Sequence, residues 1–218
     1  MTREYRKISW MLWAGVALLL TTLFLALLLA QIRYRTSLGP PLQDLGLVAN
    51  FALTNQDGHA VSLDALQGHV WIADIIFTRC MGPCLKMTRH MKELQQGLSP
   101  KSEARLVTLT TDPDFDTPSV LKKRAEQVGA DPNRWMFLTG SKKEISNLAA
   151  GSLKLTAVEK KPEEREDPSD LFIHSTIFVI VDRKAHLRGV FQTTGEGIDA
   201  QQARTQILAA ARRLEHER

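Results

Sequence analysis

The chain has 218 residues, of which 44% are hydrophobic and 24% are charged, and its formal net charge is +4 at pH 7. This length suits one core-forming domain with an appendage. The positive charges do not gather on a face interleaved with aromatic residues, so the composition gives no support for nucleic acid as a partner. The only two cysteines are Cys80 and Cys84, so any thiol chemistry belongs to this pair.

An uncharged run from Ile8 to Ile32 lies near the N-terminus. About 20 apolar residues cross a bilayer as a helix, so residues 1–32 are expected to form a membrane anchor. A cleavable signal peptide is the alternative, but its apolar region is usually shorter, about 7–15 residues, and ends in small residues. More basic residues precede the run than follow it, which favours an extracytoplasmic position for the rest of the chain: Arg3, Arg6 and Lys7 against Arg33 and Arg35.

Residues 33–47 contain Gly39, Pro40 and Pro41 and are expected to be a semi-extended linker. The folded domain is then predicted over residues 48–218. It begins with a β-hairpin over 48–53 and 60–63, closed by a turn at 55–58. The run 70–77 is almost continuously apolar and β-prone, which is typical of a strand covered on both faces.

The pattern changes from strand to helix at the cysteines. Apolar residues recur at helical spacing from Cys84 to Leu98, and Pro83 suits the first position of that helix. Both thiols therefore lie at or before a helix N-terminus, where the dipole and the unbonded N–H groups favour thiolate.

The later elements alternate between strand and helix. We predict strands over 105–111, 135–138, 173–181 and 187–193, and helices over 118–128, 142–153 and 201–214. Thr117 is expected to cap the first of these helices and Gly129 to end it. The highly charged segment 154–170 is expected to be a mobile surface loop. This order indicates one α/β domain with a mixed sheet covered on both faces, and the strand that feeds a dithiol helix is the thioredoxin arrangement.

Two cysteines four residues apart at a strand-to-helix junction can form a disulfide or chelate one soft ion, Cu(I) or zinc. A purely structural disulfide, or two unrelated buried thiols, is the alternative. Two thiolates leave Cu(I) without a third ligand, and His174 is the main candidate because it follows the charged segment and begins an otherwise apolar strand. Its alternative role is that of a hydrogen-bonded core histidine. The remaining histidines are expected at the surface or away from the site: His59, His69, His90, His186 and His216.

Asp74 lies inside the apolar strand, six residues before Cys80. A carboxylate there is costly unless it is hydrogen-bonded, and burial favours its protonated form, so it is a candidate for proton transfer or a structural group. Met81 could approach Cu(I), whereas Met87 and Met91 fit the core.

Charged residues near the cysteines have structural and functional interpretations. Asp112 and Asp116 are expected to order the turn before the Thr117 helix. The basic residues Arg79, Lys86 and Arg89 could lower the thiol pKa values, meet an acidic partner or form a solvated edge.

Three segments, FTRCMGPC, TTDPDFDTP and FIHSTIFVIVD, together resemble the Sco (SenC) family of membrane-anchored, thioredoxin-fold copper proteins. The likeness covers about residues 48–195. The matching residues are Phe77, Thr78, Cys80 and Cys84 in the first segment, Asp112, Pro113, Asp116, Thr117 and Pro118 in the second, and His174 in the third.

The resemblance implies that Cys80, Cys84 and His174 bind one copper ion. It also implies delivery of copper to the dinuclear copper centre of cytochrome c oxidase, or reduction of that centre's thiols, on the periplasmic side of a bacterial cytoplasmic membrane. The chain departs from the family in having Leu85 rather than proline after the second cysteine, and Gly-Pro-Cys is the ending of the thioredoxin loop. With Asp74, this favours a second hypothesis, a thiol–disulfide oxidoreductase acting on extracytoplasmic proteins.

Overall fold

The computed structural model describes residues 3–37, 42–165, 171–195 and 197–217, without the side chains of residues 3–9, 12, 34–37, 157, 162, 173 and 174. The chain divides into two units, Met1–Pro41 and Leu42–Arg218. The first unit consists of helix α1 (Arg3–Ser37), in which Trp13–Arg33 is long and apolar enough to cross a bilayer. The helix runs beyond the expected anchor because no glycine or proline occurs between Ile32 and Gly39,.

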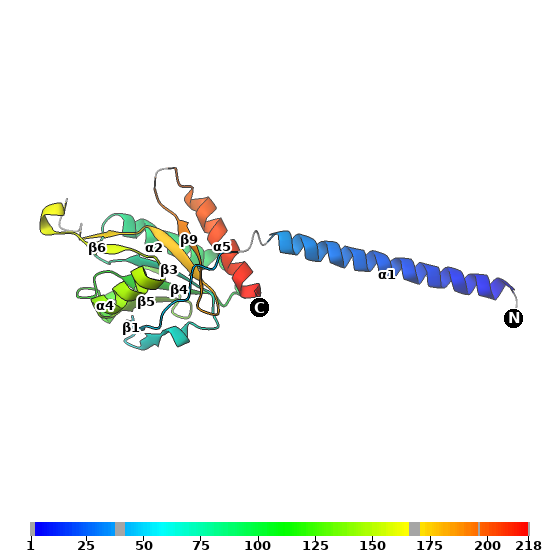
Figure 1. Ribbon diagram of the computed structural model, residues 1–218, viewed down its shortest axis with the longest axis horizontal. Helices are drawn as coiled ribbons and strands as arrows, with labels where there is room; N and C mark the ends of the chain where they lie inside the picture. The colour runs from blue at the N-terminus through cyan, green and yellow to red at the C-terminus, as the bar shows by residue number, and fades with distance from the viewer. Residues whose placement is uncertain (1–2, 38–41, 166–170, 196, 218) are drawn as a thin grey trace. The chain divides into compact units, whose positions relative to one another are not determined.

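The second unit is built around a sheet that joins seven of the described strands in the order β2-β1-β5-β4-β3-β8-β9 (Figure 1). Parallel strands β3, β4 and β5 form its centre, and β1 and β8 run antiparallel to their neighbours. The strands are β1 (Ala52–Asn55), β2 (Ala60–Ser62), β3 (Trp71–Ile76), β4 (Arg105–Thr110), β5 (Trp135–Thr139), β8 (Ile177–Val181) and β9 (Leu187–Gln192).

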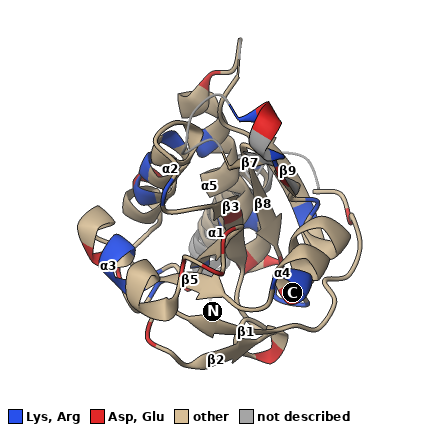
Figure 2. Cartoon of the chain, turned by 90° about the vertical axis from the view of Figure 1, so that its left-hand side faces the viewer, with Lys and Arg blue, Asp and Glu red and all other residues tan. Residues whose placement is uncertain are grey.

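Helices cover both faces of this sheet, with α2 and α3 on one side and α4 on the other (Figure 2). Alternate side chains of β3 separate accordingly: Ile72 and Ile76 join the core under α2, while Ala73 and Ile75 join the core under α4. This period of two is what a strand buried on both faces requires. The helices are α2 (Pro83–Gly97), α3 (Pro118–Val128), α4 (Lys142–Ser146) and α5 (Ala200–His216), with short turns η1 (Leu63–Ala65), η2 (Asn147–Ser152) and η3 (Pro162–Glu164).

The predicted hairpin, central strands and main helices are confirmed, and Gly129 ends α3 in a left-handed conformation, φ 65°. Thr117 precedes α3 but its side chain makes no capping hydrogen bond. The helix expected over 142–153 changes from α4 to the π-helical turn η2 after Ser146.

The expected strand 173–181 is wrong as a single element. It divides into β7 (Phe172–His174) and β8, and β7 pairs with β6 (Ala157–Glu159) in a separate two-stranded sheet of the described chain. Part of the charged segment is therefore a strand rather than a loop, because its residues 157–159 supply the hydrogen bonds that β7 no longer receives from the main sheet. Residues 166–170 lie outside the described part.

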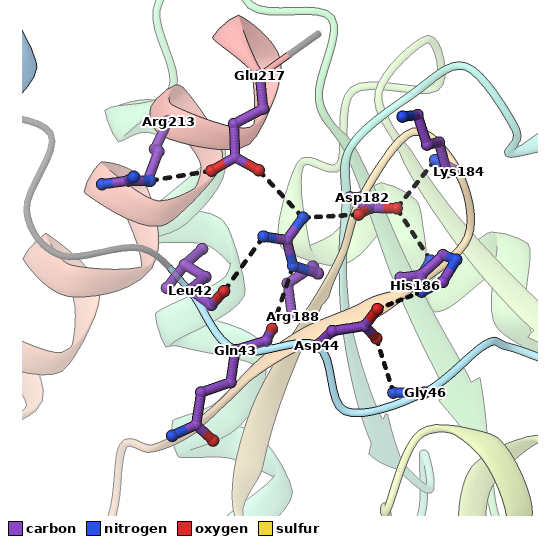
Figure 3. Close-up of polar contacts among 10 residues, drawn as sticks. All are labelled: Leu42, Gln43, Asp44, Gly46, Asp182, Lys184, His186, Arg188, Arg213 and Glu217. Atoms are coloured by element: carbon purple, nitrogen blue, oxygen red, sulfur yellow. Dashed lines mark hydrogen bonds and ion pairs between the residues drawn. The ribbon is translucent and has the colours of Figure 1, made fainter.

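The second half of the expected linker lies against the domain (Figure 3). Arg188 on β9 donates to the carbonyl oxygens of Leu42 and Gln43 at 3.2 and 3.1 Å, and its guanidinium pairs with Asp182 and Glu217 at 2.8 and 3.0 Å. We call residues 42–47 the entry strap. The strap also pairs Asp44 with His186 at 2.8 Å, and hydrogen bonds from His186 and the Gly46 N–H keep the pKa of Asp44 below its usual value.

Replacing Arg188 with methionine should destabilise the domain by about 2–3 kcal/mol, because Asp182 and Glu217 lose a shared, mostly buried partner. Urea unfolding of the full chain in detergent, followed by tryptophan fluorescence, measures the change. Lys122→Met is the control: it removes a solvent-exposed pair with Asp57, which contributes little to stability, so its effect should be much smaller. Equal effects of the two changes would contradict the role given to Arg188.

Candidate metal centre

The two cysteines lie where β3 ends and α2 begins. Cys80 follows the strand in a turn in which its N–H donates to the Phe77 carbonyl oxygen at 3.3 Å, and Cys84 is the second residue of α2, after Pro83. Cys80 is 6% exposed and Cys84 is fully buried. No disulfide joins them, and their side chains share a hydrogen bond.

That hydrogen bond changes the expected state of the second thiol. The bond with Cys80 and the burial of Cys84 raise the pKa of the Cys84 thiol well above its usual value, and the nearby Asp74 carboxylate adds to the effect. At Cys84, the hydrogen bond with Cys80 and burial thus oppose the thiolate form that the helix dipole favours,.

Asp74 lies in the middle of β3 and is fully buried. The alternation of the strand turns it toward the α2 side, the same side as Ile72 and Ile76. Thr108 donates to it from β4 at 2.7 Å, and the indole N–H of Trp135 donates to Thr108 at 2.9 Å. This network places a hydrogen-bonded carboxylate behind Cys84, which suits either a structural group or a proton acceptor.

Two aspartates that follow β4 form hydrogen bonds with the residues just before Cys80. Asp116 is fully buried and accepts from the Thr78 N–H at 3.1 Å, from the Thr78 hydroxyl and from the Thr110 hydroxyl. Burial raises the pKa of Asp116 although these donors oppose the shift. The expectation that Asp116 only orders the following turn is too narrow, since it joins the ends of β3 and β4.

Asp112 makes the neighbouring contact. It accepts from Arg79 Nε and Nη2 at 3.0 and 2.5 Å, and the Arg79 guanidinium lies 4.3 Å above the Phe115 ring centroid. The residue before Cys80 is thus tied to the turn after β4. The pattern of residues alone did not predict these pairings, but the co-occurrence of an F-T-x-C segment and a D-P-x-x-D-T-P segment was a usable signal.

His174 ends β7, where it is the register partner of Ala157, and its side chain lies outside the described residues. We call residues 77–84 the thiol loop. The neighbours of His174 in the chain lie beside this loop. The ring of Phe172 contacts Phe77 edge to face, with centroids 5.1 Å apart, and Thr176 lines a hollow together with Met81, Gly82 and Pro83. The backbone thus passes the thiol loop both before and after residue 174.

Among the described side chains, no group of three His, Cys, Asp or Glu residues is arranged to hold a metal ion, and the imidazole of His174 is not among those side chains. His90 contacts Glu93 and Arg204, and His186 pairs with the strap. Met87 and Met91 are fully buried in the core, as predicted, whereas Met81 is 75% exposed.

Comparison with known proteins decides the family. The model of the SCO1/SenC family matches residues 41–209 of this chain. The chain belongs to the SCO1/SenC family. The predicted membership and the thioredoxin-like fold are both confirmed.

Individual relatives agree with this assignment. The SCO1 protein homolog of Bacillus subtilis is 42% identical over 136 residues, which are 62% of this chain and 67% of that protein. The structure of BsSco, described as a member of the Sco family of cytochrome c oxidase assembly proteins with a disulfide switch, is 32% identical, covers 79% of this chain and 98% of its own, and has a TM-score of 0.64. Bradyrhizobium japonicum ScoI, solved with copper bound, shares the fold at 20% identity, covering 78% of this chain and 99% of its own, with a TM-score of 0.62.

Replacing Asp116 with alanine should destabilise the domain by about 2–4 kcal/mol and loosen the turn that holds Cys80, because buried hydroxyl and N–H donors lose their acceptor. Urea unfolding gives the first quantity, and the rate of Cys80 alkylation in a Cys84→Ser background gives the second. Asp114→Ala is the matched control, since Asp114 is exposed and pairs only with Lys142 among the described residues. If both variants alkylate at the same rate, Asp116 does not hold the loop.

Proposed function

We propose that this SCO1/SenC protein is a membrane-anchored metallochaperone that binds one copper ion through Cys80, Cys84 and His174. The observation that carries the proposal is the path of the chain around residue 174: Phe172 packs on Phe77 and Thr176 lies by the thiol loop. Residue 174 is two positions from each of these contacts, which supports a place for His174 near the cysteines. Two thiols and one imidazole are the soft donor set that suits Cu(I).

The burial of the two thiols supports a site in which a bound copper ion is shielded from solvent. Cys80 and Cys84 are almost inaccessible, and they are already in hydrogen-bond contact, so little rearrangement is needed for both to bind one ion. Because the hydrogen bond with Cys80 and burial raise the pKa of Cys84, copper binding there displaces a proton, as metal–thiolate formation requires. The hairpin formed by β6 and β7 carries the imidazole on an element separate from the sheet, which lets that ligand move independently of the thiols.

The proposed recipient is the copper-centre subunit of cytochrome c oxidase, or another copper or dithiol protein. The described relatives include a cytochrome c oxidase assembly protein and a copper-bound ScoI. The helix Trp13–Arg33 meets the length and composition of a membrane span, which supports residues 1–32 as the anchor. We place the domain on the periplasmic side of a bacterial cytoplasmic membrane, in line with the charges that flank the helix.

Copper titration of the reduced full chain in detergent tests the proposal. The wild-type protein should bind one Cu(I), Cys80→Ser/Cys84→Ser should retain none above background, and His174→Ala should bind about tenfold or more weakly because one ligand is lost. His90→Ala is the matched control, since His90 lies on the cysteine helix but contacts Glu93 and Arg204, and it should bind as the wild type does. A His174→Ala affinity equal to that of His90→Ala would remove His174 from the site.

A second candidate function, thiol–disulfide exchange, is favoured by the buried Asp74. In this reaction one cysteine thiolate attacks a disulfide of the partner to form a mixed disulfide, and the other cysteine resolves it, so the partner is reduced and the pair is oxidised. The resolving thiol must lose its proton, and the Asp74 carboxylate is near enough to influence the pKa of Cys84, which supports Asp74 as the proton acceptor.

Asp74→Asn separates the two functions. If Asp74 accepts the proton, reduction of a model disulfide at neutral pH should slow by about tenfold or more, within the range of general base catalysis, while the copper titration changes little. Thr108→Val is the control for simple disturbance, since it removes the described donor to Asp74 and keeps the carboxyl group. Unchanged exchange rates in Asp74→Asn would leave Asp74 with a structural role only.

A further inference from the structure

The two thiols are buried, but Met81, which lies between them in the sequence, is exposed. Cys80 and Cys84 are 6% and 0% exposed, whereas Met81 is 75% exposed. A partner's ligand cannot reach an ion held by the two buried sulfurs without a group that extends from the site to the surface. In the described part of the thiol loop, Met81 is the one exposed side chain with a soft donor atom.

Met81 stands at the edge of an open hollow of about 470 Å³. The hollow is also lined by Gly82, Pro83 and Leu85, from the loop and the first turn of α2, and by Thr176 and Thr194. Leu85 is 39% exposed although it is apolar. Leu85 therefore adds apolar surface to the lining of this hollow.

Two cations border the same hollow. Lys86 and Arg89 line it from α2, whose Lys and Arg segments are blue in Figure 2, and both are exposed. Neither forms an ion pair with any acidic side chain in the described chain, in contrast to Arg79, which Asp112 engages. Cations left unused by the fold attract an anionic partner.

The thioether of methionine has the chemistry that an exchange ligand needs. It is soft and neutral, so it binds Cu(I) in preference to hard ions, and three rotatable bonds let the sulfur move. Met87 and Met91 offer the same atom but are fully buried, so of these three methionines only Met81 is accessible to a ligand of the partner.

We propose that Met81 is the ligand through which Cu(I) passes between the buried thiols and an anionic copper-binding partner seated in this hollow. In the step, Cu(I) gains a bond to Met81 Sδ as it loses the bond to Cys80 Sγ, and the released thiolate takes one proton from solvent. Ligands of the partner then replace the thioether, Cys84 Sγ and the His174 imidazole, the Cys84 thiolate takes a second proton from solvent, and copper stays in the +1 state throughout. The inference rests on the proposed copper-binding function.

The test measures transfer and affinity separately. The Cu(I)-loaded full chain in detergent is mixed with bicinchoninate, an anionic Cu(I) chelator, and transfer is followed by its colour, while a competition titration gives the equilibrium affinity. Met81→Leu should slow transfer by about tenfold and change the affinity by less than about threefold, because an exchange ligand lowers a barrier without holding the resting ion. Met87→Leu makes the same chemical change at a buried position, where such a swap is tolerated, and should transfer at the wild-type rate.

The role of the two cations that border the hollow is tested with the double variant Lys86→Gln/Arg89→Gln. Transfer to bicinchoninate should slow severalfold at low salt and match the wild type at about 1 M salt, where charges act over only about 3 Å. The inference about Met81 is overturned if Met81→Leu transfers as fast as Met87→Leu, or if it loses affinity as much as rate, which would make Met81 a resting ligand. A wild-type chain that binds no Cu(I) would overturn the proposed function itself, an outcome visible before any transfer is measured.

Discussion

Burial of β3 on both faces is the constraint on which the site depends. Because the strand lies at the centre of the sheet and alternates between two cores, each of its residues has a fixed direction,. Asp74 must point toward α2, and the chain must leave the sheet at Ile76 with both cores closed around it. The cysteines follow within eight residues, so their depth and spacing are set by a strand that cannot shift without exposing apolar surface.

The turn after β4 adds a second fixed point. Parallel pairing of β3 and β4 brings their carboxyl ends together. The polar groups there form hydrogen bonds with one another: Asp116 accepts from Thr78 and Thr110, and Asp112 accepts from Arg79. The thiol loop is thereby tied at its start by hydrogen bonds and at its end by the first turn of α2. Met81, between these ties, is left to solvent.

Local patterns were sufficient to predict β3, the cysteine helix and the α/β order, since hydrophobic period and helix-end residues are encoded within a dozen positions. The ties of Arg79 and Thr78 join residues 33 and 38 positions apart, and no periodicity reveals which side chains meet at a sheet edge. The division of the expected strand 173–181 was hidden for a similar reason. Its apolar run continues through both parts, and only pairing with β6 shows that residues 172–174 leave the main sheet.

The entry strap and the thiol loop lie at opposite ends of the sheet. Val48 and Leu45 bond to the β8–β9 hairpin at Ala185 and Leu187, and the register of β3 with β8 places this hairpin turn near Trp71, where β3 begins. The thiols lie beyond Ile76, where it ends. The entry strap therefore lies at the end of the sheet opposite the cysteines. Arg188 and its carboxylates fix the strap there, while the thiol loop, the β6–β7 hairpin and the hollow beside Met81 lie at the other end.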